Sequence, residues 1–193
     1  MSTSEKILLS GLFISVVSLA WSPFGTSLGM GLIALSWLIS LFTRQLITPT
    51  NKFLLASMVG LFAWHIMGLL WTDNIPEGLA TLQIKLPLLI VPMSLLTVKW
   101  NSKLWTERIL QAFVISVFLA AAAGLLIGCY KTLAGISLQP SQWSPFISHI
   151  RMGILLALGW GGLLVYKSEK YRFLVFIYAI VAGLYVWQTQ SVT

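Results

Sequence analysis

The series of long apolar runs in this chain most constrains how it can fold. Short gaps separate the runs, and basic residues recur at every second gap. There are about seven such runs, and they cover Ile7–Ala20, Phe24–Phe42, Phe53–Trp71, Leu82–Val98, Ile109–Tyr130, Phe146–Tyr166 and Phe173–Trp187. A helix needs about 20 mostly apolar residues to cross the hydrocarbon core of a bilayer, and backbone polar groups in lipid must be paired within the helix. We therefore expect an all-α, polytopic membrane helix bundle of about seven transmembrane helices, forming a single transmembrane domain over residues 1–193.

Composition excludes an ordinary soluble domain. The chain is 58% hydrophobic and 9% charged, whereas soluble domains carry about 25% charged residues. The net charge of +7 could indicate nucleic-acid binding, but the basic residues are spread along the gaps instead of clustering in one patch. We expect contact with the lipid bilayer and no nucleic-acid partner.

The distribution of lysine and arginine predicts the orientation in the membrane. The basic places are Lys6, Arg44 to Lys52, Lys99 to Arg108, and Lys167 to Arg172, whereas the intervening gaps hold a single basic residue, Lys131. Because positively charged loops are retained in the cytoplasm, the amino terminus should be cytoplasmic in a multi-pass inner-membrane protein.

Two sequence features predict how the spans pack and bend. Ala120, Gly124 and Gly128 recur at four-residue spacing, which makes a smooth stripe for close helix contact in lipid. Pro87 and Pro92 fall in the fourth span, and each removes a helix hydrogen bond, so this span should be bent or locally unwound.

The first candidate binding feature lies at the outer end of the fourth span. Asp73 or Asn74 can cap a helix whose first turn contains Pro76. Lys85 follows and should fall in the outer half of the span. A functional role and simple snorkelling of its long stem to the outer headgroups remain equally open for Lys85.

The second candidate feature lies at the outer end of the sixth span. Ser144-Pro145 predicts a helix start, and Ser148, His149 and Arg151 follow within two turns. Ser148 and Arg151 share a helix face, whereas positions 149 and 151 are about 200° apart. Helix starts carry positive dipole ends, so these residues and Lys85 form a candidate substrate-binding site for an anionic group such as a pyrophosphate.

A different site is possible deeper in the chain. His65 lies well inside the third span, where it could relay protons in a transporter or, more commonly, make one interhelical hydrogen bond. Cys129 is the single cysteine, and metal, nucleotide and hydrolase motifs are absent from the sequence. We expect no metal ion and no cofactor.

Several segments together resemble the O-antigen ligase and Wzy-type polymerase family. They are Trp71-Thr72-Asp73-Asn74, Gly78-Leu79, Lys85-Leu86, Pro92, the stretch Ser144 to Met152, and Thr189-Gln190-Ser191-Val192-Thr193. The similarity is to the amino-terminal part of the family and implies that residues 1–193 are a portion of a longer architecture. The family's large outer loop and its histidine lie outside the similarity, and members often have arginine where this chain has Val192, so the catalytic residues stay unassigned.

The resemblance implies a glycosyltransferase of the bacterial inner membrane. Such a protein takes a glycan from undecaprenyl pyrophosphate at the periplasmic face and passes it to a glycan or lipid A-core acceptor. The family's outer cations hold the pyrophosphate, which agrees with Lys85 and Arg151 as candidates. The alternatives are a transporter or flippase-like subunit, with His65 at a midplane site, and a non-catalytic membrane assembly protein.

Overall fold

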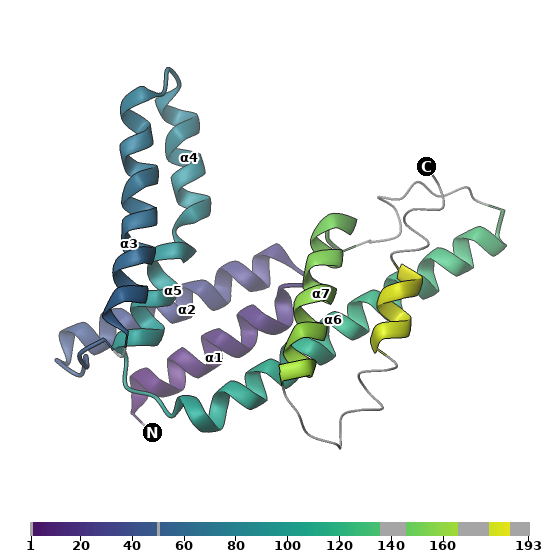
Figure 1. The fold of residues 1–193 in the computed structure, drawn as a ribbon, viewed down its shortest axis with the longest axis horizontal. Helices are drawn as coiled ribbons and strands as arrows, with labels where there is room; N and C mark the ends of the chain where they lie inside the picture. The colour runs from purple at the N-terminus through teal and green to yellow at the C-terminus, as the bar shows by residue number, and fades with distance from the viewer. Residues whose placement is uncertain (1, 50, 136–145, 166–177, 186–193) are drawn as a thin grey trace. The chain divides into compact units, whose positions relative to one another are not determined.

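A computed structural model describes residues 2–49, 51–135, 146–165 and 178–185, and it is all-helical over this part of the chain (Figure 1). The elements in chain order are α1 (Thr3–Ser18), α2 (Pro23–Phe42), α3 (Lys52–Met67), the 3₁₀ helix η1 (Gly68–Trp71), α4 (Ile75–Lys85), α5 (Pro87–Thr97), α6 (Ser102–Leu133) and α7 (His149–Val165). Residues 178–185 are also helical. The prediction of an all-α fold is therefore confirmed for the described residues.

Within the described residues, four helical segments are long and apolar enough to cross a membrane. They are Pro23–Phe42, Lys52–Trp71, Ile75–Thr97 and Trp105–Leu133, and Ile150–Leu164 is a shorter apolar helix. Helices occupy the first six predicted runs, with ends shifted by up to seven residues. Residues 178–185 of the seventh run are also helical, and the rest of that run lies outside the described residues, so the count of about seven spans stays a prediction.

The chain divides into two compact units, which are described separately. Unit 1 comprises Met1–Leu12 and Ser27–Ser102, and unit 2 comprises Phe13–Thr26 and Lys103–Thr193. The unit boundaries fall inside α1 and α2, so each of these helices contributes to both units.

Small residues bring α1 and α2 close together in unit 1. A side-chain carbon added at Gly11 would lie 2.8 Å from the Gly29 carbonyl oxygen and 2.9 Å from the Ile33 amide nitrogen. The Ser36 hydroxyl donates to the Ser4 carbonyl oxygen at 2.7 Å, and Ser36 is fully buried. Close backbone approach and serine bonds to a neighbouring carbonyl are the means by which helices associate where lipid supplies no hydrophobic drive.

A second serine ties α5 to the same pair of helices. Ser94 is fully buried, and its hydroxyl donates to the Ile33 carbonyl oxygen at 3.2 Å. Past the end of α2, the Ile47 amide donates to the carbonyl oxygen of Thr97, the last residue of α5, at 2.8 Å. The segment after α2 and the end of α5 therefore lie at the same end of unit 1.

Three of the four basic places meet at that end. The amino terminus contacts the segment after α2 through Ser4 and Gln45, whose side-chain oxygens lie 3.5 Å apart. It contacts the segment after α5 through the Asn101 amide, which donates to Glu5 Oε1 at 3.3 Å. Because the positive-inside pattern predicts these places on one membrane face, their meeting at one end agrees with that prediction.

The α3–α4 pair forms a helical hairpin (Figure 1). The Asn51 side chain caps α3 by accepting the Leu54 amide at 2.9 Å. Large apolar side chains on the pair are mostly exposed within unit 1, including Phe53 at 83% and Ile84 at 80%. Such exposure suits contact with lipid or with another protein.

The fourth span, predicted to be bent or locally unwound, is interrupted just before Pro87. The span consists of α4 and α5, which are separated by Leu86. Pro87 has no amide hydrogen to continue the α4 ladder, and the Leu86 amide instead donates to the Gln83 carbonyl oxygen, three residues back, at 3.3 Å. Pro92, by contrast, lies inside α5 without ending it.

Unit 2 has its own apolar core around α6 and α7. Its buried residues are Ala20, Val114, Val117, Ala120, Ala121, Met152, Leu155, Leu156, Tyr178 and Tyr185. Ala120, Gly124 and Gly128 are all buried, which confirms the predicted packing stripe on α6. At Gly159 of α7 the absence of a side chain leaves room for the Tyr178 ring.

Candidate functional site

The first turn of α7 carries the predicted residues of the sixth span. The helix begins at His149, and Ser148 is its cap. The Arg151 amide donates to the Ser148 side-chain oxygen at 3.4 Å, and the Met152 amide donates to the Ser148 carbonyl oxygen at 3.0 Å. Ser148 and Arg151 therefore lie together, as their three-residue spacing predicts.

The helix starts later than Ser144-Pro145 predicted. Phe146 and Ile147 are in a bend ahead of α7, while Ser144 and Pro145 lie outside the described residues. This shift moves Arg151 into the first turn, where the positive end of the helix dipole acts most strongly on a bound anion. Serine is a preferred N-cap, which gives Ser148 a structural role that the sequence analysis did not assign. The His149 side chain lies outside the described residues.

Arg151 is solvent-accessible, and aromatic rings lie close to it in the chain. Both Arg151 and Ser148 are exposed. Phe146 packs against Trp21, with ring centroids 4.7 Å apart and ring planes inclined by 49°. Both rings are half-buried and rest on the core of unit 2. The result is a helix start with an available guanidinium group, preceded by a fixed aromatic pair.

The end of α1 is anchored to the middle of α6. Trp21 Nε1 donates to the Ser116 hydroxyl oxygen at 3.0 Å, and the Ser116 hydroxyl donates to the Val17 carbonyl oxygen at 2.6 Å. Ser116 is buried, so this chain of bonds pairs polar groups that would otherwise be unsatisfied in an apolar surrounding. It also holds Trp21 in position against Phe146.

The predicted helix start of the fourth span is confirmed at Asn74. Its side chain accepts the Glu77 amide at 3.3 Å and donates to Glu77 Oε2 at 3.1 Å. Pro76 is in the first turn, as expected from its fixed φ angle. The N-cap residue is therefore Asn74, and Asp73 lies one position before it.

Lys85 lies at the junction of α4 and α5. It ends α4, ten residues after Ile75, which places it about 15 Å along the axis from the helix start at 1.5 Å per residue. It also lies twelve residues before the end of α5 at Thr97, about 18 Å by the same rise. By these distances Lys85 is slightly nearer to the start of α4 than to the end of α5, and its depth in a membrane stays a prediction. Lys85 is half-buried near the middle of the Ile75–Thr97 segment.

His65 lies at a comparable level in α3. It follows Lys52 by thirteen residues, about 20 Å along the helix axis. One ring nitrogen, Nδ1, lies 2.7 Å from the Leu61 carbonyl oxygen. This hydrogen bond is made within α3, whereas the common packing role predicted a bond to another helix.

The candidate residues fall into two groups. Lys85 belongs to unit 1, and Ser148, His149 and Arg151 belong to unit 2. Ser148 and Arg151 are brought together by the α7 cap. A common site that includes Lys85 stays a prediction. Among the described residues, no group of three or more histidine, cysteine, aspartate or glutamate side chains could hold a metal ion.

The sequence analysis missed several residues that build these regions. Trp21 was recognisable as an interfacial tryptophan at a span end, but its partner Ser116 lies 95 positions away and carried no local signal. Ser2 and Glu5 have the serine-x-x-glutamate spacing of a helix start. The Glu5 amide does donate to the Ser2 side-chain oxygen, at 3.2 Å.

Comparison of the chain with models of protein families, with curated proteins and with solved structures finds no match.

Proposed function

We propose that this chain is a multi-pass protein of the bacterial inner membrane that binds an undecaprenyl-pyrophosphate-linked glycan at the periplasmic face. Its activity is glycan ligation or polymerisation of the O-antigen ligase type, with a glycan or lipid A-core acceptor. The amino terminus is cytoplasmic, and about seven helices cross the bilayer. The observation that carries the proposal is the exposed Arg151 in the first turn of α7, beside the Ser148 cap.

The chemistry of the donor explains why such a helix start is useful. In an inverting transfer, the acceptor hydroxyl oxygen attacks the anomeric carbon of the donor sugar. The bond from that carbon to the pyrophosphate oxygen breaks, and negative charge develops on the leaving pyrophosphate. A guanidinium group forms paired hydrogen bonds with phosphate oxygens, and a helix dipole adds a favourable positive potential. Arg151 would bind and stabilise the leaving group, and the base that takes the hydroxyl proton is not assigned.

A second cation supports the same proposal. Lys85 is half-buried near the middle of an apolar 23-residue segment. Its stem spans only part of the distance of about 15 Å to the helix start, which makes snorkelling to the outer headgroups less favourable. Ionisable residues held at such depth are costly and are usually functional.

The experiment that tests donor binding uses the full chain in lipid nanodiscs. A photoreactive undecaprenyl-pyrophosphate analogue is crosslinked to the wild type, to Arg151→Gln and to the control Lys131→Gln, which removes a cation from the last turn of α6. We expect Arg151→Gln to reduce labelling about tenfold or more, because a hydrogen bond to a charged group contributes about 1.5–3 kcal/mol. Lys131→Gln should label like the wild type. Equal labelling of all three proteins would contradict the proposal.

A transporter or flippase subunit is the second candidate, and one observation favours it. The start of α3 lies at the same end of unit 1 as the end of α5. At 1.5 Å per residue, His65 is about 20 Å from the start of α3 and Lys85 is about 18 Å from the end of α5, so the two residues lie at a similar level. Two titratable groups at mid-depth are typical of transport sites. This alternative predicts that His65→Gln abolishes pH-dependent uptake in proteoliposomes, whereas the glycan proposal predicts that His65→Gln leaves donor crosslinking unchanged.

A further inference from the structure

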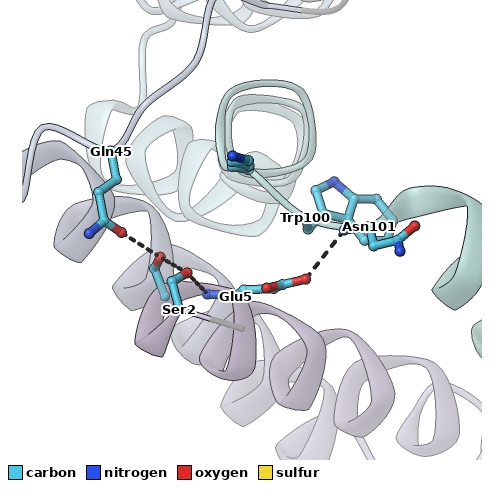
Figure 2. Close-up of a pocket in the computed structure, with 7 residues that line it drawn as sticks. Ser2, Glu5, Gln45, Trp100 and Asn101 are labelled. Carbon is cyan, nitrogen blue, oxygen red and sulfur yellow. Dashed lines mark hydrogen bonds between the residues drawn. The ribbon is translucent and has the colours of Figure 1, made fainter.

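Unit 1 contains a cavity of about 610 Å³ that the glycan proposal does not use (Figure 2). Three segments that are far apart in the sequence line it: the start of α1, the segment after α2 and the segment after α5. The lining residues are Ser2, Ser4, Glu5, Gln45, Lys99, Trp100 and Asn101. The volume is within the range of about 300–1,000 Å³ that is usual for small-molecule sites.

The cavity presents opposite charges to a ligand. Lys99 is exposed and carries an ammonium group, and Glu5 is half-buried and carries a carboxylate. No ion pair joins these two side chains in the described part of the chain, so each charge is available to a bound molecule. A ligand with one charge would be attracted by one of these groups and repelled by the other. A ligand that carries both an anionic and a cationic group would be matched by the pair.

The structure holds the Glu5 carboxylate at the cavity wall. In a full capping box the glutamate would turn back to the amide that begins its own helix. Glu5 instead reaches across to the Asn101 amide, which donates to its Oε1 at 3.3 Å, as Figure 2 shows. Ser2 still caps the start of α1, because the Glu5 amide donates to the Ser2 hydroxyl oxygen at 3.2 Å.

The surroundings point to a lipid as the ligand. The cavity lies at the ends of α1, α2 and α5, where the basic places predicted for the cytoplasmic face meet. Trp100 Nε1 donates to the Leu95 carbonyl oxygen at 3.0 Å, which leaves the ring to form an apolar wall at the depth that tryptophan prefers. Phe42, which ends α2 three residues before the lining residue Gln45, is 82% exposed.

We propose that this cavity binds the headgroup of a zwitterionic phospholipid of the phosphatidylethanolamine type at the inner membrane face. Lys99 pairs with the lipid phosphate and Glu5 with the lipid ammonium group, while hydroxyl and amide groups of Ser2 and Gln45 complete the polar contacts. The proposal is independent of the periplasmic donor site.

Native mass spectrometry of the purified full chain tests this inference. The protein is mixed with equal amounts of phosphatidylethanolamine and phosphatidylglycerol, and bound lipid is counted for the wild type, Glu5→Gln, Lys99→Gln and the control Lys52→Gln. Lys52 is a basic residue of the same predicted face that does not line the cavity. Glu5→Gln retains a carbonyl oxygen for the Asn101 amide, so the fold should persist.

The expected result is a change of lipid preference with charge. The wild type and Lys52→Gln should favour phosphatidylethanolamine, and Glu5→Gln should lose that preference, by about fivefold for one charge-assisted contact. Lys99→Gln should weaken binding of both lipids by a similar factor. Displacement of the lipid by soluble glycerophosphoethanolamine would support headgroup recognition. An unchanged lipid ratio in Glu5→Gln, or unchanged binding of both lipids in Lys99→Gln, would overturn the proposal.

Discussion

Gly11 is a residue at which one added methyl group should separate two helices. The new carbon of Gly11→Ala would lie 2.8 Å from the Gly29 carbonyl oxygen and 2.9 Å from the Ile33 amide nitrogen. Both are backbone atoms and cannot rotate away, so α1 and α2 must move apart. We expect a loss of about 1–3 kcal/mol, the usual cost of overpacking, measured as the free energy of unfolding in mixed micelles.

Gly31 provides the matched control for this substitution. It also lies in α2, and an added carbon there meets no atom within 4 Å. Gly31→Ala should leave stability unchanged or raise it slightly, because alanine has the higher helix propensity. If both variants unfold alike, the close contact of α1 with α2 is not what stabilises unit 1.

The pair formed by Trp21 and Ser116 allows a second prediction at the same scale. Trp21→Phe keeps an aromatic ring against Phe146 but removes the Nε1–H that donates to Ser116. We expect a coupling free energy of about 0.5–1.5 kcal/mol between Trp21→Phe and Ser116→Ala in a double-mutant cycle of unfolding. Strictly additive effects would show that this bond does not anchor α1 to α6.

The break between α4 and α5 belongs to the scale of elements. Pro87→Ala restores an amide that can donate to the Gln83 carbonyl oxygen and continue the helix. We expect α4 and α5 to straighten, so that spin labels at Leu79 and Leu95 move further apart in pulsed electron–electron distance measurements. Pro92→Ala is the control, because α5 already runs through Pro92 without ending. A distance that increases in neither variant would mean that Pro87 does not cause the break.

The order of the helices gives a prediction for the whole molecule. Gln45 and Lys99 lie in segments that meet at one end of unit 1, whereas Asp73 lies in the turn between η1 and α4. Single cysteines at these three positions, in a Cys129→Ser background, should be labelled by a membrane-impermeant thiol reagent from opposite faces. We expect positions 45 and 99 to react in inverted vesicles and position 73 to react in intact cells. Labelling of 45 and 99 from opposite faces would contradict the fold.

The sequence by itself determined the helical elements, the stripe on α6, the break at Pro87 and the helix start at Asn74. Each of these follows from local rules, because a backbone in lipid must pair within its own helix, and caps, prolines and small residues act over a few positions. Only the tertiary structure decided that Ser116 accepts a hydrogen bond from Trp21, that Gly11 packs against Gly29, and that Glu5 and Lys99 line one cavity. These pairings join residues far apart in the chain. The packing of whole helices selects the partners, and a short stretch of sequence contains no signal for that packing.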